Sequence, residues 1–469
     1  SMDSKRISIR YAEDGGTERD GLVEIRRNVA DLSLGDSNYA QVRILVDGTH
    51  YIKGMAVYGE NMPEGKDIVF HTNKSSDKSV HEVLKKITND PHNPFGALIK
   101  ENGGQSHYLD SDGKEQLSLI NKKSDEGDWD EWAKTLPSQF LSKQNKTLVA
   151  RQLDLAKADK SDELELYKSL TNPAIKKKML DAFAEDCDYA AVHLQAAALP
   201  RQKYQVLIPI PSLKDNEVYA PNFEDGETLA LIRYPHAGPF ETPIVKVNNK
   251  NQEATRIIGN TGVDAIGVNK HVADILSGAD FDGDTVQAIP TGKHGIRISS
   301  QPPLKGLEGF DPKSEYGSTA TRVDSEGDVH YYRGDREYKI MANTNNEMGR
   351  ISNLITDMSL KGADDNEVVK AVRHSMVVID AEKHKLDYKQ SEEDNQIALL
   401  KKKWQGHYDE DGSYHTGAST LLSRAKQTTG VDKRQGAPKI DPETGELIYK
   451  VSDKTYINKK GNEVHRQEK

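Results

Sequence analysis

Two blocks of short strands, separated by a helical block, constrain most strongly what this chain can fold into. The strand blocks lie at residues 22–75 and 204–290, and the helical block runs from about 128 to 199. Short, evenly spaced strands with many turns favour a barrel over the parallel sheet of an α/β protein. We therefore expect a fold of the α+β class.

The expected strands are short apolar runs that end at turn residues such as the pair Asp47-Gly48. The runs are Gln41–Val46, Tyr51–Tyr58, Ile68–Phe70, Val206–Ile208, Leu229–Ile232 and Ile244–Val247.

The helical block contains one clear helix start, at Asn172-Pro173. Asparagine is a good N-cap residue, and proline suits the first helical position. Apolar residues from Ile175 to Ala198 recur mostly at helical spacing, so one apolar face is expected, and we expect Pro200 to end the helix. A second helical stretch is expected at 345–400, and a shorter one near Val80–Ile87.

Composition excludes several classes of protein. The 469 residues contain no apolar run of the roughly 20 residues that a membrane span needs, so no membrane association is expected. The single cysteine, Cys187, excludes a disulfide scaffold and a cysteine-based zinc finger. The first residues lack the apolar segment of a signal peptide, and we expect a cytoplasmic location.

The sharpest chemical signal is the run Ser277–Asp284, which reads SGADFDGD. Asp280, Asp282 and Asp284 alternate along it, and Gly283 permits the tight turn that brings three carboxylates together. Such carboxylates repel one another unless a cation is bound, and oxygen-only ligands favour Mg²⁺, with Mn²⁺ as the alternative. A solvated acidic turn is the competing interpretation.

Two known binding motifs, the EF-hand loop and the P-loop, do not match the sequence. An EF-hand loop counted from Asp280 would need glycine at position 6 and glutamate at position 12, but position 12 is Thr291. The run Gly59–Lys66 has the wrong glycine spacing for a P-loop, and Asp67 follows where serine or threonine is required. The cation site of a phosphoryl-transfer enzyme is the better interpretation of the acidic run.

The string SGADFDGDTV resembles the metal-binding loop of the two-barrel RNA polymerases. That loop reads NADFDGD in the multisubunit enzymes, and it is closer to SGxDLDGD in the RNA-dependent polymerases of RNA silencing. Arg233-Tyr234-Pro235 resembles the Arg-x-Pro segment that precedes the loop in this superfamily. Glu347–Asn353 and Val378–Lys383 resemble, more loosely, a helical segment that follows it.

The resemblance implies roles for further residues. Lys53 and Lys74 look like the lysines of the first barrel, which would neutralise the triphosphate and the RNA 3′ end. Arg233, with Pro235 and Gly283, would bind the nucleotide. The catalytic set is therefore Asp280, Asp282, Asp284, Lys53 and Lys74, and the three aspartates are the metal ligands.

The same resemblance implies two double-psi β-barrels joined by a helical bridge, with helical C-terminal additions. The expected segments are a lysine-bearing barrel at 1–110, a helical connector at 111–200, a second barrel with the metal loop at 201–295, a connector and helical region at 296–400, and a polar C-terminal segment at 401–469. Because that last segment is turn-rich and has no packed end, we expect it to be truncated and the chain to belong to a longer polypeptide.

The expected activity is Mg²⁺-dependent RNA synthesis from ribonucleoside triphosphates by a single-chain polymerase of a phage or mobile element. A DNA template is favoured, and the cell would be bacterial or phage-infected. An RNA-directed polymerase or a primase remains an alternative, as does a non-catalytic nucleic-acid-binding domain of a large mobile-element protein. A metal-dependent nuclease ranks last. Template, RNA product and nucleotides are the expected partners.

The net charge of −10 is unusual for a nucleic-acid enzyme, whose surface is normally basic. The charge is uneven, however, because residues 401–469 carry 14 Lys+Arg against 10 Asp+Glu. Net charge sets solubility and long-range association, not the chemistry of a local site. The acidic balance therefore does not exclude polymerase chemistry.

Overall fold

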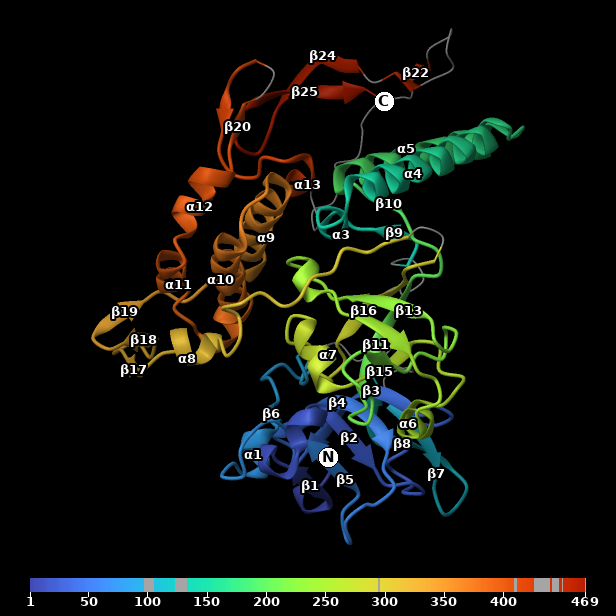
Figure 1. The fold of residues 1–469 in the computed structure, drawn as a ribbon, viewed down its shortest axis with the longest axis vertical. Helices are drawn as coiled ribbons and strands as arrows, with labels where there is room; N and C mark the ends of the chain where they lie inside the picture. Colours follow the sequence, from blue (N-terminus) through green and yellow to red (C-terminus); the bar gives the residue numbers. More distant parts are fainter. Residues whose placement is uncertain are drawn as a thin grey trace. The chain divides into compact units, whose positions relative to one another are not determined.

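The computed structural model describes residues 1–96, 105–122, 133–293, 296–408, 411–425, 439–440, 447–448 and 450–468. The chain divides into two compact units, each assembled from separate segments of sequence (Figure 1). The first unit comprises Ser1–Lys134, Ala198–Thr344 and Asp364–Asn395. The second comprises Thr135–Ala197, Asn345–Ala363 and Gln396–Lys469.

The first strand block forms an eight-stranded sheet in the first unit. Its order is β1-β5-β2-β4-β3-β8-β7, with β6 paired to β4. A parallel bridge joins Met2, in the segment that leads into β1, to Val46 at the end of β3, so the sheet almost closes on itself. The strands are β1 (Ile7–Arg10), β2 (Leu22–Ile25), β3 (Tyr39–Val46), β4 (His50–Tyr58), β5 (Ile68–His71), β6 (Lys85–Lys86), β7 (Gln105–Leu109) and β8 (Glu115–Lys122).

The second strand block forms a six-stranded sheet in the same unit, in the order β12-β14-β13-β16-β11-β15. A bridge between Tyr219 and Gly267 connects its two edges, so this sheet also nearly closes. The strands are β11 (Lys203–Pro209), β12 (Glu217–Val218), β13 (Thr228–Ile232), β14 (Ile244–Val247), β15 (Ala265–Val268) and β16 (Thr285–Pro290).

Three apolar clusters hold these sheets. One lies inside the first sheet and includes Val23, Ile44 and Ile52, and another lies inside the second and includes Leu231 and Phe281. The third joins the two sheets, because residues of β2 and β4 pack there against residues of β11 and β15. Burial of this shared apolar surface fixes one sheet against the other.

The six strand predictions are confirmed within a few residues of each end, and two helix predictions need correction. The helix that begins at Asn172 is α5 (Pro173–His193), but it ends at Leu194 in a left-handed conformation, well before Pro200, and the chain then pairs as a strand. The helix near Val80 is only α1 (Val80–Val83), because the following residues pair with β4 as β6.

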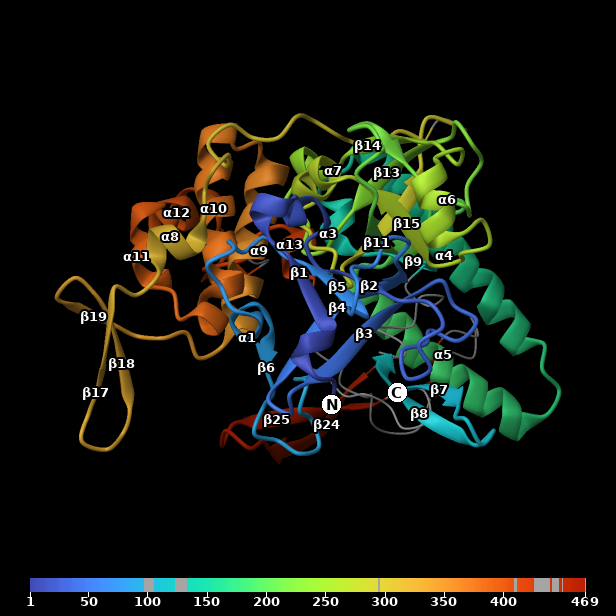
Figure 2. The ribbon, with the colours of Figure 1, turned by 90° about the horizontal axis from the view of Figure 1, so that it is seen from below.

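The rest of the first unit contains one long helix, α10, several short helices and a small sheet. Figure 2 shows the ribbon of β17–β19 beside α8 and α11. These elements are α6 (Gln252–Ile258), α7 (Lys270–Ile275), α8 (Pro312–Tyr316), β17 (Ala320–Val323), β18 (Val329–Arg333), β19 (Arg336–Tyr338), α10 (Asp365–His384) and α11 (Tyr388–Asp394).

The second unit is mainly helical, and its helices α4 and α5 run side by side (Figures 1 and 2). Asn145 and Asn172 cap the N-termini of these two helices with their side chains. The remaining described elements are β9 (Thr135–Leu136), α3 (Ser138–Leu141), α4 (Lys146–Lys168), β10 (Ala196–Ala197), α9 (Thr344–Lys361), α12 (Ile397–Trp404), β20 (His407–Tyr408), β21 (Tyr414–His415), α13 (Leu421–Arg424), β22 (Lys439–Ile440), β23 (Leu447–Ile448), β24 (Lys450–Ile457) and β25 (Glu463–Glu468).

None of the described helices has both the length and the apolar composition needed to cross a lipid bilayer.

Candidate active site

The acid loop, defined as Asp280–Asp284, lies between α7 and β16. Ser277, Gly278 and Gly283 have φ values of 57°, 65° and 117°, so the chain turns sharply before the first aspartate and again before the last. Ala279 and Phe281 are 0% and 1% exposed and anchor the loop in the core of the second sheet. Because the buried residues alternate with the aspartates, the carboxylates lie on the opposite side of the loop.

The acid loop is in direct contact with the first sheet. The backbone N–H of Phe281 donates to the carbonyl of Asp20 at 3.3 Å, and Gln41 Nε2 donates to the carbonyl of Asp282 at 3.1 Å. A Cβ atom at Gly283 would lie 2.0 Å from Gln41 Nε2, so Gln41 would have to move, and the φ of 117° is itself unfavourable for any residue with a side chain. Glycine at this position permits the close approach of the two sheets.

Lys53 brings a positive charge from the first sheet to the loop. It lies on β4, and its Nζ donates to Asp282 Oδ2 at 2.8 Å. The neighbouring Gly54 lies against the carbonyl of Gly21, where a Cβ would be only 2.2 Å from the oxygen. This tight packing of β4 against the start of β2 positions the lysine beside the acid loop.

Arg233 contacts the loop from the second sheet. It follows β13, and its Nη2 lies 3.0 Å from Asp284 Oδ2, an oxygen that also accepts the backbone N–H of Asp280 at 2.9 Å. Two residues later comes Pro235, and Tyr234 between them donates its hydroxyl to Gln287 Oε1 on β16 at 2.7 Å. The segment therefore positions Arg233 at the last aspartate; its expected contact with a nucleotide stays a prediction.

Two carboxyl groups at the acid loop, Asp280 and Asp20, have a raised pKa. Partial desolvation, followed by the charges of Asp282 and Asp284, raises the pKa of Asp280. Asp20 adds a fourth carboxylate from the segment just before β2, and burial together with the Asp280 charge raises its pKa to about 6. Excess negative charge at one place is the condition under which a cation binds well.

Lys74 is placed differently from Lys53. Its Nζ donates to the carbonyls of Glu82 and Val83 at 2.6 and 3.3 Å, at the end of α1. Burial and the charge of Lys313 lower its pKa. The described contacts thus direct this amine to a helix end, and its role toward a triphosphate stays a prediction.

The donor chemistry of the loop fits a hard divalent cation, because three carboxylates lie within five residues. Their arrangement differs from a converged metal site. Within the described parts of the chain, no three His, Cys, Asp or Glu side chains are grouped closely enough to hold a metal ion. Asp282 and Asp284 point to Lys53 and Arg233 instead.

Sequence reasoning missed three residues at this site: Asp20, Gln41 and Lys85. Desolvation and the positive charge of Lys53 lower the pKa of Lys85, and the negative charge of Asp282 opposes this shift. Lys85 is therefore close enough to Lys53 and Asp282 for their charges to act on it. Gln41 and Lys85 lie in strands of the first sheet and Asp20 lies just before β2, so all three are more than 190 positions before the acid loop. Nothing in their local sequence indicates a meeting with that loop.

Comparison with known proteins finds similarity among solved structures. No protein-family model matches the chain, and no curated protein matches it. Among solved structures, the RNA-dependent RNA polymerase QDE-1 from Thielavia terrestris aligns with a TM-score of 0.46 and 14% sequence identity. The alignment covers 85% of this chain and 49% of that one, so the present chain spans about half the length of that polymerase.

Proposed function

We propose that the acid loop is the catalytic centre of a nucleotidyltransferase that makes RNA from ribonucleoside triphosphates, in the core of a single-chain two-barrel polymerase. One observation carries the proposal: Lys53 of the first sheet meets Asp282 of the second at 2.8 Å. The motif SGADFDGD and a lysine from a separate strand block, which sequence alone leaves unconnected, thus lie at one place. Opposite charges from two sheets suit a substrate that carries both phosphates and a cation.

The proposed reaction joins a nucleotide to an RNA 3′ end. The 3′-hydroxyl oxygen forms a bond to the α-phosphorus, the bond from that phosphorus to the bridging oxygen breaks, and pyrophosphate leaves with the electron pair. The hydroxyl proton passes to solvent. No oxidant or reductant is needed.

Each residue has a role that follows from its charge and position. Asp280, Asp282 and Asp284 would hold Mg²⁺, which when bound lowers the pKa of the attacking hydroxyl and stabilises charge on the phosphate oxygens. Lys53 would move from Asp282 to the triphosphate, since an ammonium group serves either anion. Arg233 would keep Asp284 oriented and offer its remaining N–H groups to the nucleotide.

The experiment is incorporation of labelled ribonucleotides on single-stranded DNA, duplex DNA and RNA templates, with deoxyribonucleotides as a parallel series. The wild-type chain should give alkali-sensitive product in Mg²⁺ on at least one template, and the productive template decides between a DNA-directed and an RNA-directed enzyme. Asp282→Asn should abolish synthesis. Asp335→Asn is the matched control, because Asp335 is exposed in the turn between β18 and β19.

A folded chain that gives no product on any template would contradict the proposal. Equal synthesis by Asp282→Asn and the wild type would contradict the assignment of the loop.

A second candidate is a non-catalytic nucleic-acid-binding domain that keeps the same scaffold. The pairing of Asp282 with Lys53 and of Asp284 with Arg233 favours it, because ion pairs satisfy these carboxylates without a metal. Nucleic-acid binding that is unaffected by Mg²⁺, together with no synthesis, would select this candidate.

A further inference from the structure

The second unit contains a pocket lined by positive and polar side chains. It has a volume of about 620 Å³ and lies between α9, the end of α12 and the β20–β21 hairpin. None of its lining residues is acidic, and three of them, Arg350, Lys401 and Lys402, are cations. This composition suits an anionic ligand of nucleotide size.

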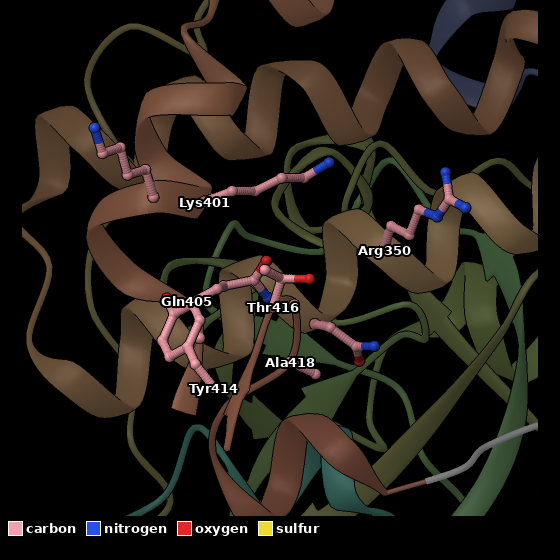
Figure 3. A pocket seen from close by; sticks show the side chains of 10 residues that line it. Arg350, Lys401, Gln405, Tyr414, Thr416 and Ala418 are labelled. Atoms are coloured by element: carbon pink, nitrogen blue, oxygen red, sulfur yellow. The ribbon is translucent and has the colours of Figure 1, made fainter. Parts of the chain in front are cut away.

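The cations are placed around one opening. Figure 3 shows the Lys401 side chain extending toward the side of the pocket on which Arg350 lies, above Gln405 and Thr416. Arg350 also pairs with Glu347 of the preceding helical turn at 3.1 Å, but its side chain is 67% exposed. The exposed guanidinium of Arg350 can therefore contact a phosphate while it stays paired with Glu347.

The wall of the pocket is rigid, because one buried carboxylate holds it. Asp357 is fully buried and accepts hydrogen bonds from Gln405 Nε2 and from the backbone N–H groups of Ser419 and Thr420, at 2.9–3.0 Å. The backbone N–H of Gly406 also donates to the carbonyl of Gly417 at 2.9 Å. These bonds fix both ends of the hairpin against α9 and α12.

Two exposed tyrosines extend the pocket. Tyr414 lines it, Tyr408 is its cross-strand partner on the hairpin, and the two rings lie 4.9 Å apart. They are 55% and 72% exposed. Large aromatic faces open to solvent are uncommon, and beside cations they are typical of surfaces on which unpaired bases stack.

We propose that this pocket binds single-stranded nucleic acid, with its phosphates at Arg350, Lys401 and Lys402 and a base stacked on Tyr414. A single strand fits better than a duplex, because stacking on a side chain requires an unpaired base. The second unit alone carries this site, which is independent of the reaction proposed at the acid loop.

The test measures binding of a fluorescent twelve-nucleotide oligouridylate to the full chain by anisotropy, in EDTA and over a series of salt concentrations. EDTA separates this site from any metal-dependent binding at the acid loop. Lys402→Gln should lower the slope of log K against log salt by about 0.7, the value expected for one lost phosphate contact on a single strand. Lys403→Gln is the matched control: it removes the same charge from the next residue of α12, which does not line the pocket.

The stacking contact is tested separately. Tyr414→Leu should weaken binding by about 5- to 100-fold, whereas Tyr414→Phe should bind like the wild type, because base stacking needs only the ring. The tyrosine hydroxyl lies against Gly406, so both substitutions also remove a packing contact. The melting temperature of each variant should be recorded, in order to separate a loss of stability from a loss of binding. If Tyr414→Leu does not fold, Thr416→Glu, which adds a negative charge inside the pocket, provides the test and should abolish binding.

Equal loss of binding in Lys402→Gln and Lys403→Gln would overturn the proposal, because it would indicate general attraction to α12. Unchanged binding in Tyr414→Leu, or equal affinity for polyglutamate, would overturn it as well, since the site would then not distinguish a nucleic-acid strand from an acidic peptide.

Discussion

Lys53 Nζ donates to Asp282 Oδ2 across 2.8 Å, and this ion pair joins the two sheets through residues that lie 229 positions apart in the sequence. Both side chains are mostly shielded from solvent, with exposed fractions of 25% and 20%. The pair therefore fixes a positive and a negative group of the proposed catalytic centre in one geometry.

Replacement of Lys53 should affect catalysis far more than stability. Lys53→Met should lower the rate of ribonucleotide incorporation by about 100-fold or more, as expected for loss of one charge that stabilises the transition state. The free energy of unfolding should change by only about 1 kcal/mol, because the pair is partly exposed. Lys53→Arg should recover part of the rate. Lys250→Met, at an exposed lysine of the same unit, is the control, and an equal loss of rate there would contradict the prediction.

Gly283 should tolerate no side chain. Gly283→Ala combines a left-handed φ of 117° with a Cβ atom 2.0 Å from Gln41 Nε2, so it should destabilise the first unit by about 1–3 kcal/mol and displace the acid loop. Gly278→Ala is the control: its φ is also left-handed, at 65°, but no atom lies within 4 Å of the added Cβ. In urea denaturation, Gly283→Ala should lower the free energy of unfolding more than Gly278→Ala does.

The added cost at Gly283 should come from Gln41. The double variant Gly283→Ala with Gln41→Ala should recover part of the lost stability, because the shorter side chain removes the clash. A double variant no more stable than Gly283→Ala would show that the backbone conformation alone sets the cost.

Asp357 should make the stability of the second unit depend on acid pH. Burial raises its pKa, but hydrogen bonds from Ser423, Gln405 and Thr420 outweigh that effect, so the pKa in the folded state is lowered. The stabilisation is thus present above the ordinary aspartate pKa of about 3.9 and is lost as pH falls through the lower folded value. Asp357→Asn should cost about 1–3 kcal/mol at pH 7.

The measurement is chemical denaturation of both proteins from pH 7 to below pH 4. The difference in the free energy of unfolding between wild type and Asp357→Asn should be constant near neutral pH and should become smaller below about pH 4. A difference that stays constant into acid would show that the carboxylate charge contributes nothing.

Mg²⁺ should bind at the acid loop, and its addition and removal should change the stability of the folded chain. Mg²⁺ at about ten times its dissociation constant should stabilise the folded chain by about 1.4 kcal/mol, seen as a higher melting temperature that EDTA reverses. Asp282→Asn should lose most of this effect, and Asp335→Asn should keep it. A rise of equal size in both variants would place the metal elsewhere.

Local sequence patterns predicted the parts of the fold that depend on neighbouring residues. Asn172 caps α5 as expected, and β4 and β14 lie at or beside the apolar runs that indicated them. The end of α5 was wrong because Leu194 adopts a left-handed conformation so that β10 can pair with β9, a tertiary demand that no helical periodicity contains.

The residues of the candidate site also form two groups: those that the local sequence indicates, and those that only tertiary packing brings to the site. Asp280, Asp282 and Asp284 are recognisable because they are adjacent in sequence and alternate with buried residues. Asp20, Gln41 and Lys85 were missed because only the packing of one sheet against the other brings them to the loop. Lys74 was assigned by the same family resemblance as Lys53; its amine donates to the carbonyls that end α1, and its role toward a triphosphate stays a prediction.

The central claim is that the acid loop and Lys53 bind a metal ion and a nucleoside triphosphate together. The most direct measurement is a crystal structure with Mn²⁺ and a non-hydrolysable ribonucleoside triphosphate, in which anomalous scattering locates the metal. We expect a peak in contact with at least two of the three loop carboxylates, close to the usual Mg²⁺–oxygen distance of about 2.1 Å, with Lys53 Nζ on a phosphate oxygen. A bound triphosphate elsewhere, with Lys53 still paired to Asp282 and no metal at the loop, would contradict it.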